Sequence, residues 1–297
     1  MSLTIEPICA TQPALGGRVS GVDIAAGVSA EDAALIEAGM DEYGVLVFHG
    51  QAIDDGQQYA FSEHFGPMET ATGDIAKAGE RRLPMNINDI SNLDQQGNVM
   101  SRDDRRRLFG LGNMLWHSDS SFKTTPAKFS LLSAREIPDA GGNTEFADMR
   151  AAWDALDRSK QSKCMDLVCW HSQINSRGLL GFTQWDEDEL DKNKPVPQRL
   201  VRRHPNTGRL SLYLSAHAGG IEGWPTPEAR MFLRDLNEHA TKREFVYEHQ
   251  WRQLDLVMWD NRVLMHRARE YDPSQVRDLH RTTVADRCPT LEQAIVA

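Results

Sequence analysis

The pattern of hydrophobic and polar positions predicts a few helices among many short strands. A helix is predicted over residues 29–43, where Ser29 can cap it and apolar side chains recur with helical spacing at Ala33, Ile36, Met40 and Tyr43. A second helix is predicted over 54–65, before Gly66 and Pro67. Helical patterns also cover 148–156 and the segment that begins at Thr226.

Short runs of β-branched, aromatic and other apolar residues predict strands over 45–48, 129–134, 210–215, 245–250, 256–259 and 281–285. Many short strands with few long helices favour a mainly β fold, an antiparallel barrel or sandwich, over a doubly wound sheet. The chain has no internal repeat and no Gly/Ser linker, so we expect one domain over 1–297.

Two polar, charge-rich stretches, about 71–107 and 175–203, are expected to be long loop insertions. Their charge runs are typical of a solvated surface. Long ordered loops on a barrel are also where lids and substrate contacts lie, and we expect 175–203 to act as a lid.

Composition narrows the class of protein. The net charge is −10 over 297 residues, which argues against a nucleic-acid partner because phosphate binding needs a concentrated positive face. No apolar run is long enough for a membrane span, and the N-terminus does not resemble a signal peptide, so we expect a cytoplasmic protein without a membrane partner. With ten histidines and four scattered cysteines, a metal would be held by nitrogen and oxygen.

The strongest candidates for metal ligands are His117, Asp119 and His266. In a strand, residues two apart point to the same face, so His117 and Asp119 could bind one ion. This pair alone could equally be a hydrogen-bonded pair at a sheet edge. His266 ends an apolar run, where metal ligation or a satisfied core histidine would explain it. Two histidines and one carboxylate leave three positions open, which suits a non-haem Fe(II) oxygenase.

Two arginines near the C-terminus are candidates for binding acids. Arg277 and Arg281 are four apart, so in a strand they would share a face, and arginine suits bidentate capture of carboxylates. Exposed surface arginines are the alternative. The turn that begins at Gly141 offers the hydroxyl of Thr144, and a plain hairpin is its alternative.

Together these pieces resemble the taurine dioxygenase/2,4-dichlorophenoxyacetate dioxygenase family. The matching motifs are Trp116-His117-x-Asp119, Gly141-Gly-Asn-Thr144, Trp259-Asp-Asn-Arg-x-x-x-His266-Arg-Ala and Arg277-x-x-x-Arg281-x-Thr. The likeness runs from Gly21-Val-Asp23 nearly to the C-terminus. The segments 115–122, 144–156 and 243–249 are more similar to the phenoxyacetate branch.

The resemblance implies a double-stranded β-helix, or jelly-roll, with flanking helices. It implies Fe(II) bound by His117, Asp119 and His266. It also implies 2-oxoglutarate bound by Arg277 with help from Thr144, and a substrate acid held by Arg281. Asn113, His204 and His217 match positions that line the substrate pocket in the family. His280 has no role that the resemblance explains.

The implied activity is hydroxylation of the carbon next to the ether oxygen of a phenoxyacetate-type acid, giving a phenol and glyoxylate with succinate and CO2. The expected cofactor is Fe(II), and the expected co-substrates are 2-oxoglutarate and O2, with ascorbate as an activator in vitro. The substrate is expected to be a small carboxylic acid, and the protein is expected to form a homo-oligomer. Phe122, Phe182 and Trp185 are candidates for an aryl pocket. The alternatives are an oxygenase for an alkylsulfonate, sulfate ester or natural aromatic acid, a cupin-like binding protein, and a zinc hydrolase.

Overall fold

The computed structural model describes residues 2–12, 14–71, 75 and 79–294. Its largest element is a seven-stranded sheet in the order β1-β2-β3-β13-β5-β15-β4. All pairings are antiparallel except that of β2 with β3. The strands are β1 (Thr4–Pro7), β2 (Gly17–Ser20), β3 (Val45–Phe48), β4 (Asn88–Ser91), β5 (Ala127–Glu136), β13 (Leu256–Asp260) and β15 (Asp278–Ala285).

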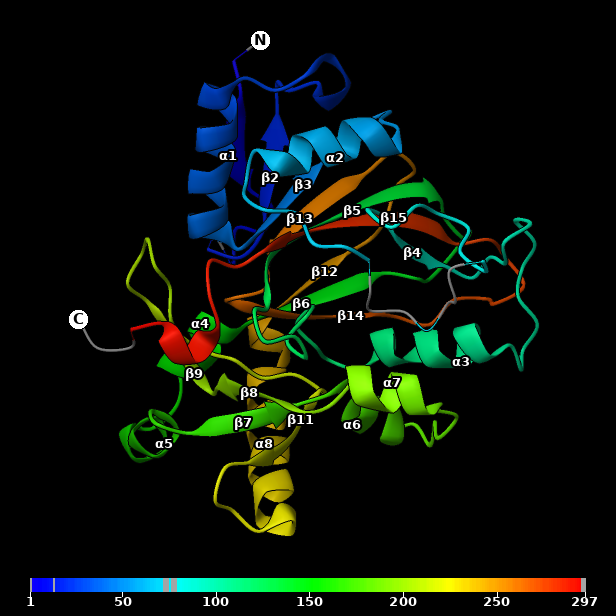
Figure 1. Cartoon of the computed structure of the whole chain (residues 1–297). Helices are drawn as coiled ribbons and strands as arrows, with labels where there is room; N and C mark the ends of the chain where they lie inside the picture. Colours follow the sequence, from blue (N-terminus) through cyan, green and yellow to red (C-terminus); the bar gives the residue numbers. More distant parts are fainter. Residues whose placement is uncertain (1, 13, 72–74, 76–78, 295–297) are drawn as a thin grey trace.

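A three-stranded antiparallel sheet lies beneath the large one (Figure 1). Its order is β12 (Val246–His249), β6 (Thr144–Asp148) and β14 (Leu264–Ala268). Both sheets contribute apolar side chains to one buried cluster, including Val47 and Trp259 from the large sheet and Phe146 from the small one. The protein is therefore mainly β with helices, as the hydrophobic pattern predicts.

Alternation along the central strands explains why helices cover the other face of the large sheet. Leu46 and Phe48 alternate with the inward Val47, and they pack in a second cluster with Ile36 and Phe61 from the helices. These helices are α1 (Ala30–Tyr43) and α2 (Asp55–Glu63), capped by the side chains of Ser29 and Asp54. They lie on the upper side of the sheet (Figure 1).

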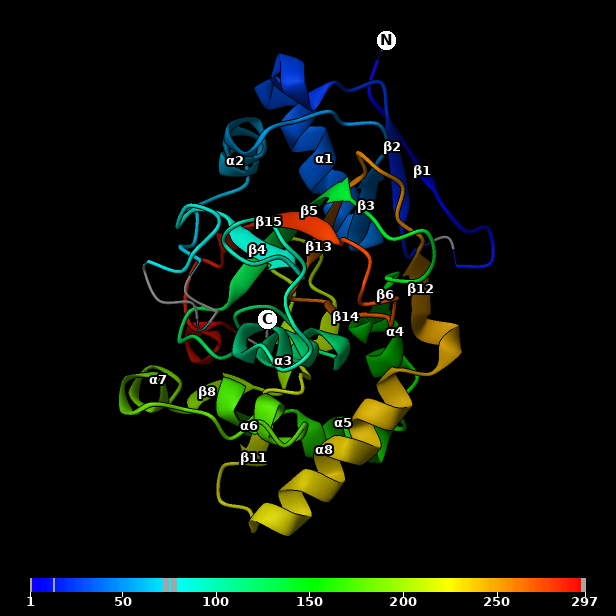
Figure 2. The ribbon, with the colours of Figure 1, turned by 90° about the vertical axis from the view of Figure 1, so that its right-hand side faces the viewer.

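Most of the remaining strands and helices form a lower region around the long helix α8 (Thr226–Ala240). Its strands are β7 (Val168–His171), β8 (Val196–Arg199), β9 (Val201–Arg203), β10 (Leu210–Leu212) and β11 (Ala218–Ile221). The other helices are α3 (Arg105–Gly110), α4 (Met149–Asp154), α5 (Arg158–Cys164), α6 (Gln173–Gly178) and α7 (Glu187–Lys192), with 3-10 turns η1 (Ile24–Ala26), η2 (Leu111–Met114), η3 (Arg243–Phe245) and η4 (Thr290–Glu292). Figure 2 shows α3 above α6.

The structure corrects the prediction of two long loops. The stretch 175–203 contains most of α6, all of α7 and the strands β8 and β9, because its polar residues cap helices and pair with neighbours rather than only face solvent. The stretch 71–107 contains β4 and the start of α3, and its residues 72–74 and 76–78 lie outside the described part. Within the described residues, no helix combines the length and apolar character that a bilayer crossing requires.

Candidate metal centre and substrate cavity

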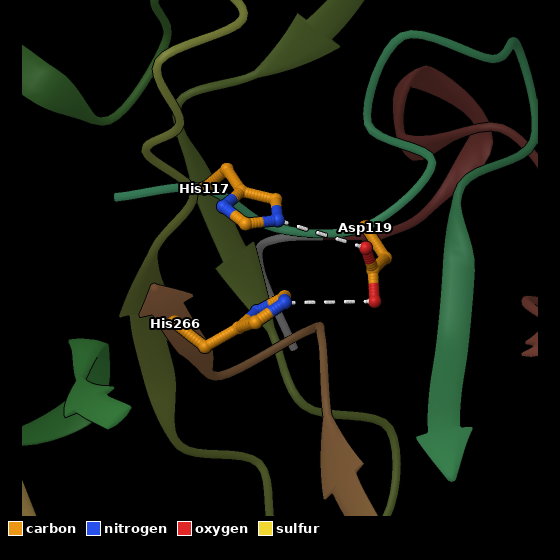
Figure 3. A group of neighbouring side chains, drawn as sticks. All are labelled: His117, Asp119 and His266. Carbon is orange, nitrogen blue, oxygen red and sulfur yellow. Dashed lines mark ion pairs between the residues drawn. The ribbon is translucent and has the colours of Figure 1, made fainter. Parts of the chain in front are cut away.

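Two histidines from distant parts of the chain are joined through their backbones. His117 and His266 form an isolated antiparallel bridge, in which each backbone N–H donates to the carbonyl of the other residue at 3.0 and 2.8 Å. Their imidazole rings lie with centroids 4.2 Å apart. The side chain of Asp119 converges on the same point (Figure 3).

The prediction that a strand carries both His117 and Asp119 is wrong. His117 takes part in the bridge, but Asp119 and Ser120 lie in a turn, and Ser120 has the left-handed φ of 53°. Glu69 fixes this turn, because its carboxylate accepts hydrogen bonds from Ser120 Oγ at 2.7 Å and Lys123 Nζ at 2.5 Å. The turn, rather than strand alternation, directs Asp119 towards the histidines.

The geometry of these three residues fits a metal ion. His117 Nε2 lies 3.8 Å from Asp119 Oδ1, and His266 Nε2 lies 3.7 Å from Asp119 Oδ2. One ligand atom from each residue lies within 4.8 Å of the others. His117 Nδ1 is 2.7 Å from the carbonyl oxygen of Leu115, which can only accept, so the proton is on Nδ1 and the lone pair of Nε2 is free for a metal.

Electrostatics also prepare the three residues for a cation. Burial lowers the pKa of His117 and of His266, so both imidazoles are neutral and able to bind a metal near neutral pH. Burial alone would raise the pKa of Asp119, but the positive charge of Arg281, together with the hydrogen bond from Ser130, outweighs burial and lowers that pKa. The set is therefore two neutral nitrogens and one carboxylate anion, which suits a borderline divalent ion such as Fe(II).

A buried polar network holds Asp119 in place. Its Oδ2 accepts a hydrogen bond from Ser130 Oγ at 2.7 Å, and its backbone N–H donates to Asn261 Oδ1 at 3.0 Å. Asn261 Nδ2 donates in turn to Ser130 Oγ at 2.9 Å, and the indole of Trp259 donates to Asn261 Oδ1 at 3.1 Å. The Trp-Asp-Asn segment at the end of β13 therefore supports the ligand set.

A cavity of about 350 Å³ opens beside the three residues and is lined by His117 and Asp119 among others. Arg277 and Arg281 both line it, as expected for two residues that share a face. Arg281 Nη1 donates to Asp119 Oδ1 at 2.5 Å, while its Nε is buried without a hydrogen-bond partner among the described residues.

Arg277 is a buried cation without an acidic partner. It is 5% exposed, Nη2 donates to the carbonyl of Gly142 at 3.2 Å, and no described carboxylate pairs with it. Burial lowers its pKa to about 10, so it stays charged at neutral pH. An isolated buried charge is costly, and this one faces a cavity that an anion could enter.

The other predicted residues divide into two groups. Asn113 and His217 line the cavity, and the ring of Phe122, also on its wall, lies 5.0 Å from that of His217. Thr144 is buried but does not line the cavity within the described part of the chain, and its Oγ1 accepts a hydrogen bond from Trp251 at 3.0 Å. The proton of that hydroxyl remains available to donate.

His204 is a correction, because it does not line the cavity as far as the structure describes it. Its Nε2 lies 3.3 Å from Asp260 Oδ2 and 3.6 Å from Asp41 Oδ1. His204 is therefore part of a buried ionic network that also includes Arg262, which pairs with Asp260. A histidine that satisfies a buried carboxylate and a histidine that binds substrate look the same in a sequence.

Two aromatic candidates also lie elsewhere. Phe182 and Trp185 do not line this cavity within the described residues. They pack edge-on against Phe109, at ring distances of 5.7 and 5.8 Å, and Phe109 does line it. Phe109 was missed because nothing in its sequence neighbourhood distinguishes it from an ordinary apolar helix residue.

His280 is explained by two carboxylates. Its Nδ1 lies 2.5 Å from Asp55 Oδ1 and its Nε2 lies 3.3 Å from Asp278 Oδ1. In β15 it alternates with Leu279 and Arg281, so it faces the opposite side of the sheet, towards α2 and away from the cavity. Burial alone would lower the pKa of His280, but the two carboxylates outweigh burial and raise it above the ordinary value of 6.5.

Comparison with known proteins gives one consistent result. The model of the family described as "Taurine catabolism dioxygenase TauD, TfdA family" matches residues 5–283. The alpha-ketoglutarate-dependent 2,4-dichlorophenoxyacetate dioxygenase of Cupriavidus pinatubonensis is 44% identical over 96% of this chain and 99% of its own length. The (S)-phenoxypropionate/alpha-ketoglutarate-dioxygenase of Delftia acidovorans is 35% identical over 99% of both chains.

Among solved structures, AAD-2 in complex with Mn(II) and N-oxalylglycine superposes with a TM-score of 0.94. The two chains are 53% identical, and the match covers 98% of this chain and 100% of AAD-2.

Proposed function

We propose that this chain, which belongs to the taurine catabolism dioxygenase TauD, TfdA family, oxidises phenoxyacetate-type acids. It is a 2-oxoglutarate-dependent dioxygenase, an oxidoreductase that uses Fe(II), 2-oxoglutarate and O2. The observation that carries the substrate class is its 44% identity with a 2,4-dichlorophenoxyacetate dioxygenase over nearly the whole length of both chains.

In the proposed reaction, the carbon next to the ether oxygen is hydroxylated. The resulting hemiacetal collapses to a phenol and glyoxylate. Bound Fe(II) supplies the O2 chemistry, in which 2-oxoglutarate is converted to succinate and CO2 and an oxygen atom is delivered to the substrate.

His117, Asp119 and His266 are the proposed iron ligands, because they offer two neutral imidazoles and an anionic carboxylate at one buried point. Three protein ligands leave positions for 2-oxoglutarate and O2. Ser130 and Asn261 keep the Asp119 carboxylate oriented by the hydrogen bonds described above.

Arg277 is the proposed partner of the 2-oxoglutarate carboxylate that is remote from the iron. Its buried, uncompensated charge on the cavity wall supports this role, because an incoming carboxylate would supply the missing counter-ion. We propose that the hydroxyl of Thr144 helps to bind 2-oxoglutarate. Thr144 lies two residues after Gly142, whose backbone carbonyl accepts a hydrogen bond from Arg277.

Arg281 is proposed to contact the acid group of the substrate while one of its nitrogens holds Asp119. Its buried, unpartnered Nε supports this second contact. Asn113 and His217 are the proposed polar wall of the substrate site, and Phe122 a proposed contact for an aryl ring. Holding the acid group at one place fixes which carbon reaches the oxidant, and positioning therefore determines the product.

A panel of acids tests this function. The protein is supplied with Fe(II), 2-oxoglutarate, ascorbate as the proposed activator and air, and succinate is measured with phenoxyacetate, each phenoxypropionate enantiomer, an alkylsulfonate and a sulfate ester. Succinate release is expected to be highest with an aryloxy acid, to need O2 and to stop with EDTA. A cupin-like binding protein would release none, and a zinc hydrolase would act without O2.

We further propose that residues 1–297 form a single domain whose two sheets are the halves of a double-stranded β-helix. The apolar cluster shared by both sheets supports this arrangement. A cytoplasmic location is proposed because Cys9, Cys164, Cys169 and Cys288 are all free thiols, typical of a reducing compartment. A homo-oligomer is proposed from adjacent exposed apolar side chains, Leu179 and Leu180, and light scattering after size exclusion would test it.

A further inference from the structure

A second buried arginine lines the cavity and has no role in the reaction described so far. Arg177 lies in the last turn of α6 and is 4% exposed. It shares the cavity wall with Asn113 and His217. Helix α6 is tied to the segment that carries His217. The backbone N–H of Ser172, the residue that caps α6, donates to the carbonyl of His217 at 2.9 Å.

The contacts of Arg177 leave its charge uncompensated. Nη1 donates to Ser176 Oγ at 3.1 Å, and the guanidinium carbon lies 4.3 Å from the centre of the Phe109 ring. Nε is buried without a hydrogen-bond partner, and no carboxylate among the described residues pairs with the group. Burial lowers the pKa of Arg177 to about 10, so it is still a cation at neutral pH.

Other arginines on this cavity have their charge balanced by carboxylates. Arg82 binds the carboxylates of Asp89 and Asp278 at 2.8 and 2.5 Å. Arg281 binds Asp119. Arg177 and Arg277 are the described arginines that are buried on this cavity, and neither has an acidic partner. A buried charge of this kind is stable only with an anion or a strong polar partner.

The guanidinium of Arg177 fits closely against a glycine. Gly112 in η2 lies directly against it, and a Cβ at that position would stand 2.4 Å from Arg177 Cζ. His217, on the same wall, has a buried Nδ1 without a hydrogen-bond partner. Two unsatisfied buried polar groups on one wall indicate that a ligand completes them.

We propose that Arg177 binds the carboxylate of the organic acid substrate, as a specificity-determining residue that acts together with Arg281. This inference rests on the proposed function, which assigns Arg277 to 2-oxoglutarate and Arg281 to the substrate acid. Because Arg281 is also paired with Asp119, a second cation can complete the site for that acid. The ring of Phe109 under the guanidinium, next to Phe182 and Trp185, makes this end of the cavity suited to an acid with an apolar or aryl body.

Arg177→Met removes the charge and keeps an apolar side chain of similar reach. Its KM for phenoxyacetate is expected to rise about 10- to 100-fold, as for a lost charge-assisted hydrogen bond, while the KM for 2-oxoglutarate stays within about twofold. Arg177→Lys keeps the charge and is expected to recover part of the loss. A binding measurement without turnover is made anaerobically with Mn(II)-loaded protein and N-oxalylglycine, by titrating phenoxyacetate and its neutral amide in a calorimeter.

Arg105→Met is the matched control. Like Arg177, Arg105 stacks on an aromatic ring, that of Phe182, but it pairs with Glu189 and does not line the described part of the cavity. It should leave both KM values unchanged. The proposal predicts that Arg177→Met loses most of the preference for the acid over the amide.

Equal weakening of the acid and the amide would overturn the proposal, since it would show a packing role. So would an unchanged affinity for the acid. If Arg177→Met does not fold, Arg177→Lys and Arg177→Gln carry the same comparison, with Lys expected to bind the acid more tightly than Gln. Wild-type protein that oxidises no aryloxy acid would instead refute the proposed function, and this inference with it.

Discussion

At the scale of single residues, Asp119 is held by three different partners. Ser130 bonds one carboxylate oxygen, Arg281 bonds the other, and Asn261 fixes the backbone. The carboxylate therefore points at the two imidazoles before any ligand arrives, so little reorganisation is needed on metal binding. The sequence predicted that His117, Asp119 and His266 come together because they match motifs of a known family. It could not predict Ser130, because a serine inside a strand has no distinguishing pattern.

Arg277→Ala tests the assignment of the 2-oxoglutarate site. The KM for 2-oxoglutarate is expected to rise about 100-fold, because a charge-assisted bidentate contact would be lost. The KM for phenoxyacetate should change far less, and succinate release over a range of 2-oxoglutarate concentrations measures both.

In a thermal-shift experiment, Mn(II) should still stabilise Arg277→Ala whereas added N-oxalylglycine should not stabilise it further. An unchanged requirement for 2-oxoglutarate would contradict the assignment.

His280 predicts a pH-dependent contribution to stability. The carboxylates of Asp55 and Asp278, themselves paired with Arg135 and Arg82, raise the pKa of His280 above 6.5. A raised folded-state pKa means that protonated His280 stabilises the fold fully below pH 6.5, and that this stabilisation is lost as the pH rises through the folded-state pKa. His280→Gln should therefore lower the free energy of unfolding by about 1 to 2 kcal/mol more at about pH 5.5 than at about pH 9.

Urea unfolding at both pH values measures this difference. His239→Gln is the control, because the ring of His239 bonds the backbone carbonyl of Ala152 instead of a carboxylate. A loss of stability for His280→Gln that is the same at both pH values would show that the ion pairs do not matter.

At the scale of elements, the hydrophobic pattern predicted the four adjacent strands β3, β13, β5 and β15 of the large sheet and the two helices upon it, but it missed β1, β2 and β4. Val45–Phe48 is found as predicted, and α1 begins at the Ser29 cap. The pattern failed where polar residues build structure. The segment 175–203 is rich in polar residues, yet it forms α7 through the capping box of Asp186 and Glu189. The turn that carries Asp119 depends on Glu69, which is far away in the sequence.

A buried amide helps to hold α2 on the sheet. Gln58 Nε2 donates to the carbonyls of Leu131 and His280 at 3.0 and 2.9 Å, and its Oε1 accepts from Ser133 Oγ at 2.6 Å. Gln58→Met keeps the volume but loses these hydrogen bonds, so we expect about 2 to 4 kcal/mol lower stability in urea unfolding.

Gln57→Met is the control on the same helix. Gln57 closes the capping box at the helix start and is more exposed, so its replacement should cost about 1 kcal/mol or less. Equal losses for the two variants would mean that the buried amide is not what ties α2 to β5 and β15.

At the scale of the whole molecule, residues from the middle and from the C-terminal part of the chain meet at one site. His117 lies before the small sheet in sequence, while His266 and Arg281 come from the last strands. Their proximity could be predicted from the sequence because the motifs resemble those of a family in which the matching residues lie together. The resemblance did not single out Arg177, and it assigned His204 to the substrate pocket. The surroundings of both residues depend on which buried charges have partners, and this could not be predicted from the sequence.

If residues 1–297 form the proposed single domain, the protein should unfold in one cooperative transition. Calorimetry is expected to show one peak that moves as a whole to higher temperature with Mn(II) and N-oxalylglycine, because the ligands bind only the folded state. Two peaks, with only one shifted by the ligands, would show that the metal centre belongs to a separate unit.

The most direct test of the central claim is to measure phenol and succinate together. The protein is given Fe(II), 2-oxoglutarate and phenoxyacetate in air, and both products are quantified over time by liquid chromatography. We predict that phenol and succinate appear in equal amounts and that neither forms without O2. Succinate without phenol from every aryloxy acid tested, or no succinate at all, would contradict the account.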